Sequence, residues 1–338
     1  MIRWGIIGCG DVCEKKSGPA FALTRGSSVS SVMRRDRAKA RSYAARHGVP
    51  RYTGDAAELL DDPEIDAFYV ATPPDTHAYY ACEAARRRKP CYVEKPMARS
   101  YDECRQMLAA FREKDTKLFV AYYRRCLPRF IQVKELLESG AIGPVHSVQV
   151  RHAMLPHPAH EAAVPWRLQA ERSGGGLFLD VGSHTLDLLD YVLGPLSDVR
   201  GEAWREDERF EVEDQVVLEA SVAHNGASVR VSGRWDFCAD APEDLVEIVG
   251  DEGSLSFAMQ SPRPLLLRTA CEQRTLAIED SAFVQQPMIQ AIVDELSGEG
   301  SCPSSGESAA RTSRVMDEVL ANYYGGRAGP FWTRVQRS

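Results

Sequence analysis

The sequence has no long apolar run and no excess of positive charge. A membrane-spanning helix needs roughly 18 consecutive apolar residues, and no such run occurs in the 338 residues. The 41 basic and 48 acidic residues give a net charge of −7, which disfavours general nucleic-acid binding. The first residues also lack the charged start and apolar stretch of a secretory signal peptide. We therefore expect a cytoplasmic protein with no membrane and no nucleic-acid partner.

A paired cysteine motif is also missing. The nine cysteines are an odd number, are widely spaced and include no CxxC. A disulfide framework or a zinc site would show a different pattern. We expect reduced thiols, most of them small core residues, and no bound metal.

The first 122 residues alternate strand-like and helix-like segments. This alternation predicts βαβ units with a parallel sheet, so we expect a doubly wound Rossmann domain over residues 1–122. The expected strands are Arg3–Ile7, Val29–Met33, Ala67–Ala71, Cys91–Val93 and Leu118–Tyr122, and the expected helices are Asp36–His47, Thr76–Arg88 and Tyr101–Lys114.

Strand-like runs dominate the second part of the chain, residues 123–338. We expect an α+β domain here, with an open and largely antiparallel sheet that binds substrate and mediates oligomerisation. Asn225-Gly226 is a hairpin signal between two of the runs. The expected strands are Val145–Arg151, Val216–Val222, Ala227–Ser232, Leu245–Val249 and Leu265–Thr269, and the expected helices are Leu127–Ser139, Val181–Leu193, Gln285–Leu296 and Gly306–Tyr324.

A glycine motif, Gly8-Cys9-Gly10-Asp11-Val12-Cys13, follows the first strand directly. In a GxGxxG fingerprint the first two glycines allow a tight turn and a close approach of the backbone to a pyrophosphate. Cys13 occupies the third position, where a smaller residue is usual, so an ordinary strand-to-helix turn remains an alternative. The motif favours a dinucleotide site that includes Gly8, Gly10, Asp11 and Val12.

Basic residues follow the second strand, where an NAD-binding chain usually carries an acidic residue for the ribose hydroxyl. Arg34 and Arg35 come directly after Met33, and a guanidinium can bind a 2′-phosphate. This favours NADP over NAD. Asp36 is better interpreted as the cap of the following helix.

Two further segments carry candidate catalytic groups. Glu94-Lys95-Pro96 ends a predicted strand, where ligands of parallel sheets bind, although a surface lysine is the alternative. Gly174-Gly175-Gly176 precedes Asp180 and His184, which are spaced to share a helix face. A histidine beside a carboxylate suits proton transfer. The alternative is that Asp180 only caps the helix and His184 is a core residue.

Taken together, these segments resemble the Gfo/Idh/MocA oxidoreductase family. The similarity spans nearly the whole chain and is closest to NADP-dependent members of the 1,5-anhydrofructose reductase type. The motifs that carry it, besides the glycine loop, are Ala71-Thr72-Pro73-Pro74 with His77, Glu94-Lys95-Pro96, Arg124-Arg125 with Pro128, Trp166-Arg167, and the run from Gly174 to His184.

The resemblance implies a nicotinamide coenzyme and a sugar, polyol or related carbonyl substrate. Because an open sheet face that no helix covers should be buried against a partner, we also expect a homodimer or homotetramer. The resemblance assigns Lys95, Asp180 and His184 as catalytic residues and implies a cis Lys95-Pro96 bond. To the glycine loop and to Arg34 and Arg35 at the strand end, the resemblance adds further coenzyme contacts. They are Thr72, Pro73, His77, Glu94, Lys95, Trp166 and Arg167.

The substrate pocket is expected to include Tyr122, Tyr123 and Arg124. Tyr123 stands where many members of the family carry Asn or Gln, so the exact substrate stays open. The alternatives are a trans-dihydrodiol or dicarbonyl dehydrogenase, which the aromatic side chains would suit, and a non-catalytic NADP-binding sensor. The presence of Lys95, Asp180 and His184 disfavours the sensor.

Overall fold

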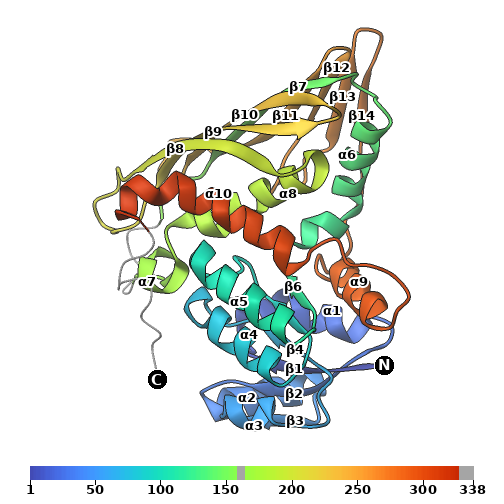
Figure 1. The fold of residues 1–338 in the computed structure, drawn as a ribbon, viewed down its shortest axis with the longest axis vertical. Coiled ribbons are helices and arrows are strands. Elements are labelled where there is room, and N and C mark those ends of the chain that lie inside the picture. The colour runs from blue at the N-terminus through green and yellow to red at the C-terminus, as the bar shows by residue number, and fades with distance from the viewer. Residues whose placement is uncertain (158–163, 327–338) are drawn as a thin grey trace. The chain divides into compact units, whose positions relative to one another are not determined.

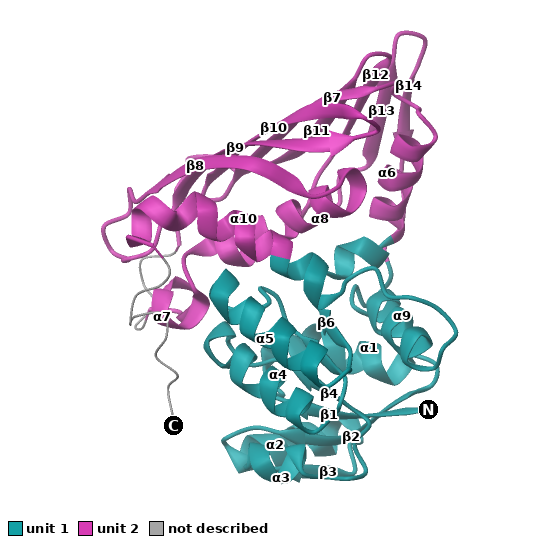
Figure 2. Ribbon diagram, viewed as in Figure 1, with its two compact units in different colours: residues 1–127, 281–310, 334–338 teal, residues 128–280, 311–333 magenta. Residues whose placement is uncertain are grey.

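The computed structural model describes residues 1–157 and 164–326, and these form two compact units (Figures 1 and 2). The first unit comprises Met1–Leu127 and Ser281–Ala310, and the second comprises Pro128–Asp280 and the described residues from Arg311 onward. Within the described residues, no helix combines the length and the apolar character needed to cross a membrane.

The first unit is discontinuous along the chain. The chain leaves the first unit near the expected boundary, but residues 281–310 return to it. The hydroxyl of Ser304 donates to the carbonyl of Val120 at 2.8 Å, and Phe119 forms a bridge with Ser305. These contacts add the late segment to the edge of the first unit's sheet, which the local pattern of residues 281–310 does not reveal.

The first unit contains a six-stranded parallel sheet with the order β3-β2-β1-β4-β5-β6, as expected for a Rossmann domain. All four residues of β4 are buried, which is typical of a parallel sheet covered on both faces. The strands are β1 (Ile2–Ile7), β2 (Ser27–Met33), β3 (Arg51–Thr53), β4 (Ala67–Val70), β5 (Cys91–Val93) and β6 (Leu118–Val120). The helices are α1 (Gly18–Leu23), α2 (Arg37–His47), α3 (Ala56–Leu60), α4 (His77–Arg86), α5 (Tyr101–Glu113) and α9 (Gln286–Leu296), with short turns η1 (Cys13–Ser17), η2 (Pro74–Thr76) and η3 (Tyr123–Cys126).

The second unit contains an eight-stranded sheet with the order β14-β13-β12-β11-β7-β10-β9-β8. Only β7 and β10 pair in parallel, so the sheet is largely antiparallel, as expected. The strands are β7 (Val145–Ala153), β8 (Leu196–Trp204), β9 (Gln215–His224), β10 (Ala227–Asp236), β11 (Glu243–Gly250), β12 (Gly253–Phe257), β13 (Leu265–Thr269) and β14 (Gln273–Leu276). The helices are α6 (Pro128–Glu138), α7 (Ala170–Ser173), α8 (Ser183–Leu193) and, from Arg311 onward, α10 (Gly306–Tyr324), with turns η4 (Trp166–Leu168) and η5 (Phe178–Gly182).

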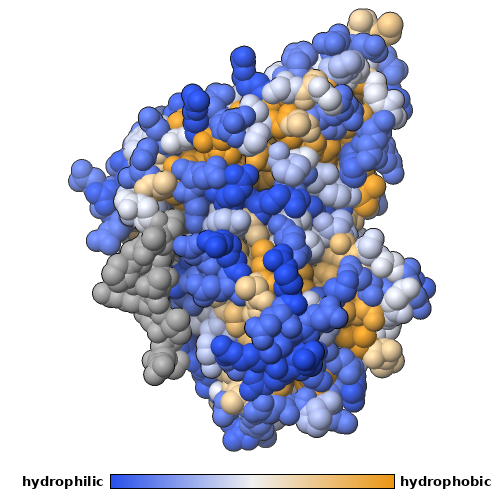
Figure 3. Space-filling model, viewed as in Figure 1, coloured by the Kyte–Doolittle hydropathy of each residue, from blue (hydrophilic) through white to orange (hydrophobic). Residues whose placement is uncertain are grey.

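The two faces of this second sheet differ in polarity. In β7, Val148 and Val150 are buried, whereas Gln149 and Arg151, which alternate with them, are exposed. Helices α8 and α10 run along one face of the sheet (Figure 1). Over β9 to β11 the surface shows apolar side chains among hydrophilic ones (Figure 3). The alternation of buried and exposed residues is the pattern of a sheet with one covered face.

The hairpin between β9 and β10 forms where the sequence predicted it. Asn225 and Gly226 have φ angles of 49° and 81°, the positive values that a type I′ turn requires. The prediction that Asp36 caps the second helix is also confirmed, because its carboxylate accepts the backbone N–H of Lys39 at 3.1 Å.

Candidate functional site

The glycine loop forms the turn between β1 and the first helical segment. Gly8 has a φ of +92°, and a Cβ there would meet the Thr72 side chain at 2.7 Å, so glycine is required. At Gly10 a Cβ would meet only the carbonyl oxygen of Gly8, at 3.9 Å. The backbone is therefore open to a ligand at Gly10, directly before the helical N–H groups of Asp11 and Val12. This open turn at a helix start fits the pyrophosphate of a dinucleotide.

Cys13 is accommodated at the third position of the motif. Its side chain is fully buried, and its thiol lies 3.7 Å from the Gly8 carbonyl. The close approach expected at this position occurs at Gly18 instead, where a Cβ would meet the Tyr43 hydroxyl at 2.4 Å. The departure from the strict motif thus leaves the turn intact.

Arg34 lies beside the glycine loop. It is half-buried, and its Nη1 donates to the carbonyl oxygen of Cys9 at 3.4 Å. Asp36, the first acidic residue after β2, is engaged as the cap of α2. The residue next to the loop is therefore a guanidinium, while the nearest carboxylate in the chain is used by its own helix. Arg35 is exposed.

His77 links two of the predicted coenzyme-binding loops. It is fully buried, with Nε2 at 2.8 Å from the Thr72 carbonyl and Nδ1 at 3.0 Å from the Pro96 carbonyl. Burial lowers the pKa of His77. The ring therefore holds the loop that contains Thr72 and Pro73 against the loop that contains Lys95 and Pro96.

Glu94 is oriented by a buried network that the sequence did not predict. The carboxylate is 7% exposed, and its Oε1 accepts the Tyr69 hydroxyl and the Gln285 amide, each at 2.6 Å. The Tyr92 hydroxyl donates to the Gln285 carbonyl oxygen at 3.3 Å. Gln285 lies 191 residues after Glu94, so no local spacing could have revealed it. Burial, with Glu94 nearby, raises the pKa of Tyr69 well above its usual value and keeps it a donor.

The Lys95-Pro96 peptide bond is cis, as expected. The backbone N–H of Lys95 donates to Glu94 Oε2 at 3.2 Å, so the network that fixes Glu94 also fixes the start of this turn.

The three expected pocket residues lie in different surroundings. Tyr122 is fully buried in the core of the first unit. Tyr123 and Arg124 are on η3, where the Arg124 guanidinium stacks over the Tyr123 ring at 5.2 Å.

In the second unit, Trp166 and Arg167 are close to Asp180. The Arg167 guanidinium stacks over the Trp166 ring at 4.4 Å, and its Nε donates to Asp180 Oδ2 at 3.1 Å. The sequence analysis assigned Arg167 to coenzyme binding and Asp180 to catalysis, whereas the structure joins the two side chains in one ion pair. Asp180 itself lies in the π-helical turn η5, and His184 is buried in the first turn of α8. Single π-helical turns occur frequently at functional sites.

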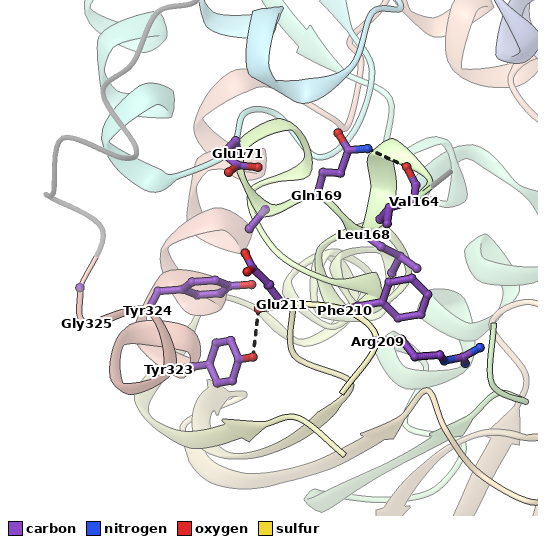
Figure 4. Close-up of a pocket in the computed structure, with 12 residues that line it drawn as sticks. Val164, Leu168, Gln169, Glu171, Arg209, Phe210, Glu211, Tyr323, Tyr324 and Gly325 are labelled. Atoms are coloured by element: carbon purple, nitrogen blue, oxygen red, sulfur yellow. Dashed lines mark hydrogen bonds between the residues drawn. The ribbon is translucent and has the colours of Figure 1, made fainter. Parts of the chain in front are cut away.

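A cavity of about 760 Å³ opens near the same segment of the second unit (Figure 4). The Tyr323 hydroxyl donates to the Glu211 carbonyl at 3.1 Å, and the Gln169 amide donates to the Val164 carbonyl at 2.6 Å. The lining residues are Val164, Leu168, Gln169, Ala170, Glu171, Arg209, Phe210, Glu211, Tyr323, Tyr324, Gly325 and Gly326. None of the predicted catalytic residues is among them.

A glycine turn open at Gly10 and the strand order β3-β2-β1-β4-β5-β6 are typical of a dinucleotide-binding protein. Comparison with known proteins agrees with this class. Residues 2–122 match the oxidoreductase family with an NAD-binding Rossmann fold, and residues 130–256 match the GFO/IDH/MocA C-terminal domain.

Individual relatives also cover the chain. Oxidoreductase P35 of Formosa agariphila is 37% identical over 318 residues, which cover 94% of this chain and 97% of that protein. 1,5-Anhydro-D-fructose reductase of Ensifer adhaerens is 31% identical over 193 residues, 57% of each chain. The fold is similar to that of levoglucosan dehydrogenase in complex with NADH and levoglucosan, with a TM-score of 0.83, 23% identity, and coverage of 96% of this chain and 97% of that one.

The chain therefore belongs to the Gfo/Idh/MocA family and is an NAD(P)-dependent oxidoreductase.

Proposed function

We propose that the protein is an NADP(H)-dependent oxidoreductase that acts on a secondary alcohol or carbonyl of a sugar, cyclitol or related small polyol. The observation that carries the coenzyme assignment is Arg34. Its guanidinium lies beside the glycine loop, and the next carboxylate, Asp36, caps α2. A 2′-phosphate would thus meet a cation, and a free ribose hydroxyl would lack its usual acidic partner.

The proposal assigns the coenzyme contacts residue by residue. The backbone at Gly8 to Val12 would hold the pyrophosphate, and Arg34 with Arg35 would hold the 2′-phosphate. Thr72, Pro73 and Glu94 would contact the nicotinamide half, while His77 acts through the two loops that it joins. From the second unit we assign Trp166 and Arg167.

The proposed catalytic residues are Lys95, Asp180 and His184. The bound nicotinamide supplies or accepts the hydride. In the reductive direction His184 donates a proton to the substrate oxygen, and Lys95 stabilises the negative charge that develops there. Asp180, whose carboxylate accepts from Arg167, would orient the site. Acid–base help of this kind contributes on the order of 10²- to 10⁴-fold.

The substrate class is supported by the relatives and by the pocket residues. The relatives reported above include enzymes named for an anhydro sugar and for levoglucosan. Tyr123 and Arg124 are 7% and 5% exposed, and in the proposed pocket they would contribute an aromatic ring and a cation. Such a mixture suits a hydroxylated ring better than a long apolar chain.

The test is a screen of NADPH oxidation over keto-sugars, anhydrofructose, cyclitol ketones and small diketones, repeated with NADP⁺ over polyols and trans-dihydrodiols. We expect turnover of a cyclic polyol or its ketone. Turnover of dihydrodiols alone would support the dihydrodiol dehydrogenase alternative. Tight NADPH binding without turnover of any compound would support the sensor alternative, and full activity of His184→Ala would refute the proposed mechanism.

A further inference from the structure

Residues 166–184 of the second unit form a continuous segment, here called the 166–184 segment. It runs from η4 through α7 and three glycines into η5 and the start of α8. The Arg167–Asp180 ion pair, at 3.1 Å, connects its beginning to its end. The segment therefore carries both the coenzyme contacts and the proton-transfer groups that the second unit contributes to the proposed function.

A buried carboxylate holds the glycine turn of this segment. Glu213 is 1% exposed, and both of its oxygens lie 2.9 Å from the backbone nitrogen of Gly176. That nitrogen comes just before the helical residues 178–193, where a negative charge is favoured by the helix dipole. Glu213 thus binds the turn two residues before the helical turn that contains Asp180.

Glycine is required at position 176 by this contact, and its two neighbours are constrained separately. A Cβ on Gly176 would meet the backbone oxygen of Glu213 at 2.2 Å, and a Cβ on Gly175 would meet the Leu179 side chain at 2.7 Å. Gly174 has a φ of +89° and ends α7. The space beside Gly176 is filled by Glu213.

Glu213 is itself held in place. The Tyr324 hydroxyl, near the end of α10, donates to Glu213 Oε2 at 2.6 Å. The next residue, Asp214, accepts the backbone N–H groups of Glu206 and Asp207 at 2.9 and 2.7 Å. A side chain fixed on both sides can transmit its position to the turn that it binds.

We propose that Glu213 is a positioning residue for the reaction. It holds the glycine turn so that the Trp166–Arg167 pair and the Asp180–His184 helix stay fixed relative to one another, and Tyr324 orients its carboxylate. The roles of these four residues in coenzyme binding and proton transfer rest on the proposed function. The contact between Glu213 and Gly176 is independent of the proposed function, because it is observed in the structure.

The test compares Glu213→Ala and Glu213→Gln with Glu211→Gln, an exposed glutamate two residues away, as the matched control. The readouts are amide hydrogen exchange of residues 174–182, NADPH affinity by direct titration, and kcat and KM on the best substrate. Glutamine keeps the volume and one acceptor for the Gly176 N–H, so it is the conservative variant.

We expect exchange in residues 174–182 to be at least tenfold faster in Glu213→Ala, with no such increase in β4 or β5. NADPH affinity should fall about tenfold, and kcat should fall more than KM rises. Glu213→Gln should stay within about threefold of the wild type in every readout, and Glu211→Gln should match the wild type. His184→Ala should lower kcat without changing exchange or NADPH affinity.

A folded Glu213→Ala protein with wild-type exchange and wild-type NADPH affinity would overturn the proposal, as would equal acceleration of exchange across the whole chain. If Glu213→Ala does not fold, Tyr324→Phe replaces it, and unchanged exchange in residues 174–182 of that variant would overturn the proposal instead. Failure of the wild-type protein to bind any nicotinamide coenzyme would refute the proposed function, while the exchange measurement would still test the Glu213 contact.

Discussion

Coenzyme preference can be tested at a single residue, Arg34. The side chain is half-buried, and its Nη1 already donates to the Cys9 carbonyl at a rather long 3.4 Å. A hydrogen bond between charged groups contributes roughly 1.5–3 kcal/mol, and the partial exposure of Arg34 favours the lower end of that range. We therefore expect the wild-type protein to bind NADPH at least tenfold more tightly than NADH, since about 1.4 kcal/mol corresponds to a factor of ten.

Two substitutions at this position should differ in a predictable way. Arg34→Ala removes the attraction, so NADPH affinity should fall about 10- to 30-fold with little change for NADH. Arg34→Asp also adds repulsion, which is about 1 kcal/mol per pair of unit charges at 4 Å in water. The preference of the Arg34→Asp protein for NADPH over NADH should therefore disappear or reverse. Arg37→Ala is the control, because Arg37 is exposed and its guanidinium lies 6.0 Å from the Tyr52 ring.

The assay is a fluorescence titration of both coenzymes at 0.15 M salt, where exposed charges are screened as in the cell. Equal affinities of the wild type for NADPH and NADH would refute the assignment. An equal loss for both coenzymes in Arg34→Ala would show that the residue acts by holding Cys9 and the loop instead. A parallel titration with adenosine 2′,5′-bisphosphate separates these cases, because this ligand lacks the nicotinamide half.

Three further outcomes follow from the same structure. Lys95→Ala and His184→Ala should each lower kcat by about 10²- to 10⁴-fold while NADPH affinity stays within twofold, as measured by steady-state kinetics and titration; an unchanged kcat would contradict their catalytic roles. Val249 is half-exposed and lies between Ser147 and Ser254 on the open face of the second sheet, where we expect a dimer or tetramer interface. Light scattering should therefore give a multiple of 37.5 kDa for the wild type and a smaller mass for Val249→Arg. A wild-type monomer at micromolar concentration would contradict this. Burial alone would raise the pKa of Asp244, but hydrogen bonds from the backbone N–H groups of residues 259–261 and the His152 ring, 3.9 Å away, hold it well below its usual range. Because the folded-state pKa lies below the unfolded value, ionised Asp244 stabilises the protein above about pH 4, and this stabilisation is lost as the pH falls. Asp244→Asn should therefore lower the free energy of unfolding by about 2 kcal/mol at pH 7 and by less at pH 3, as measured by urea unfolding. An equal loss at both pH values would refute this.

The parts of the fold that the sequence predicted are those with a strong local pattern. The buried strand β4, the cap at Asp36 and the turn at Asn225-Gly226 all formed as expected. Four strands were not predicted, and three of them, β3, β8 and β14, lie at the edges of their sheets. Edge strands are short or polar, since one side of each is open to solvent. The fourth, β12, alternates serine with apolar residues and is only five residues long.

The candidate site divides in the same way. Glycines and charged residues that follow a strand or start a helix could be recognised locally, because their role depends on backbone geometry. The residues that orient them could not. Gln285 bonds Glu94 across 191 residues, and Glu213 bonds Gly176 across 37 residues. Neither partner has a motif, since any buried donor or acceptor that reaches the right point would serve.

Each unit contains a buried glutamate that binds a loop. Glu94 accepts the Tyr69 hydroxyl and a side-chain amide in the first unit, and Glu213 accepts the Tyr324 hydroxyl and a backbone N–H in the second. An unpaired buried carboxylate costs several kcal/mol, so such a group is retained only where its partners are fixed. The same cost makes the geometry stiff, because any displacement of the loop leaves a charge without its donors. We therefore expect the two glutamates to limit the motion of the loops that they bind, Glu94 at the start of the Lys95-Pro96 turn and Glu213 at the glycine turn before Asp180.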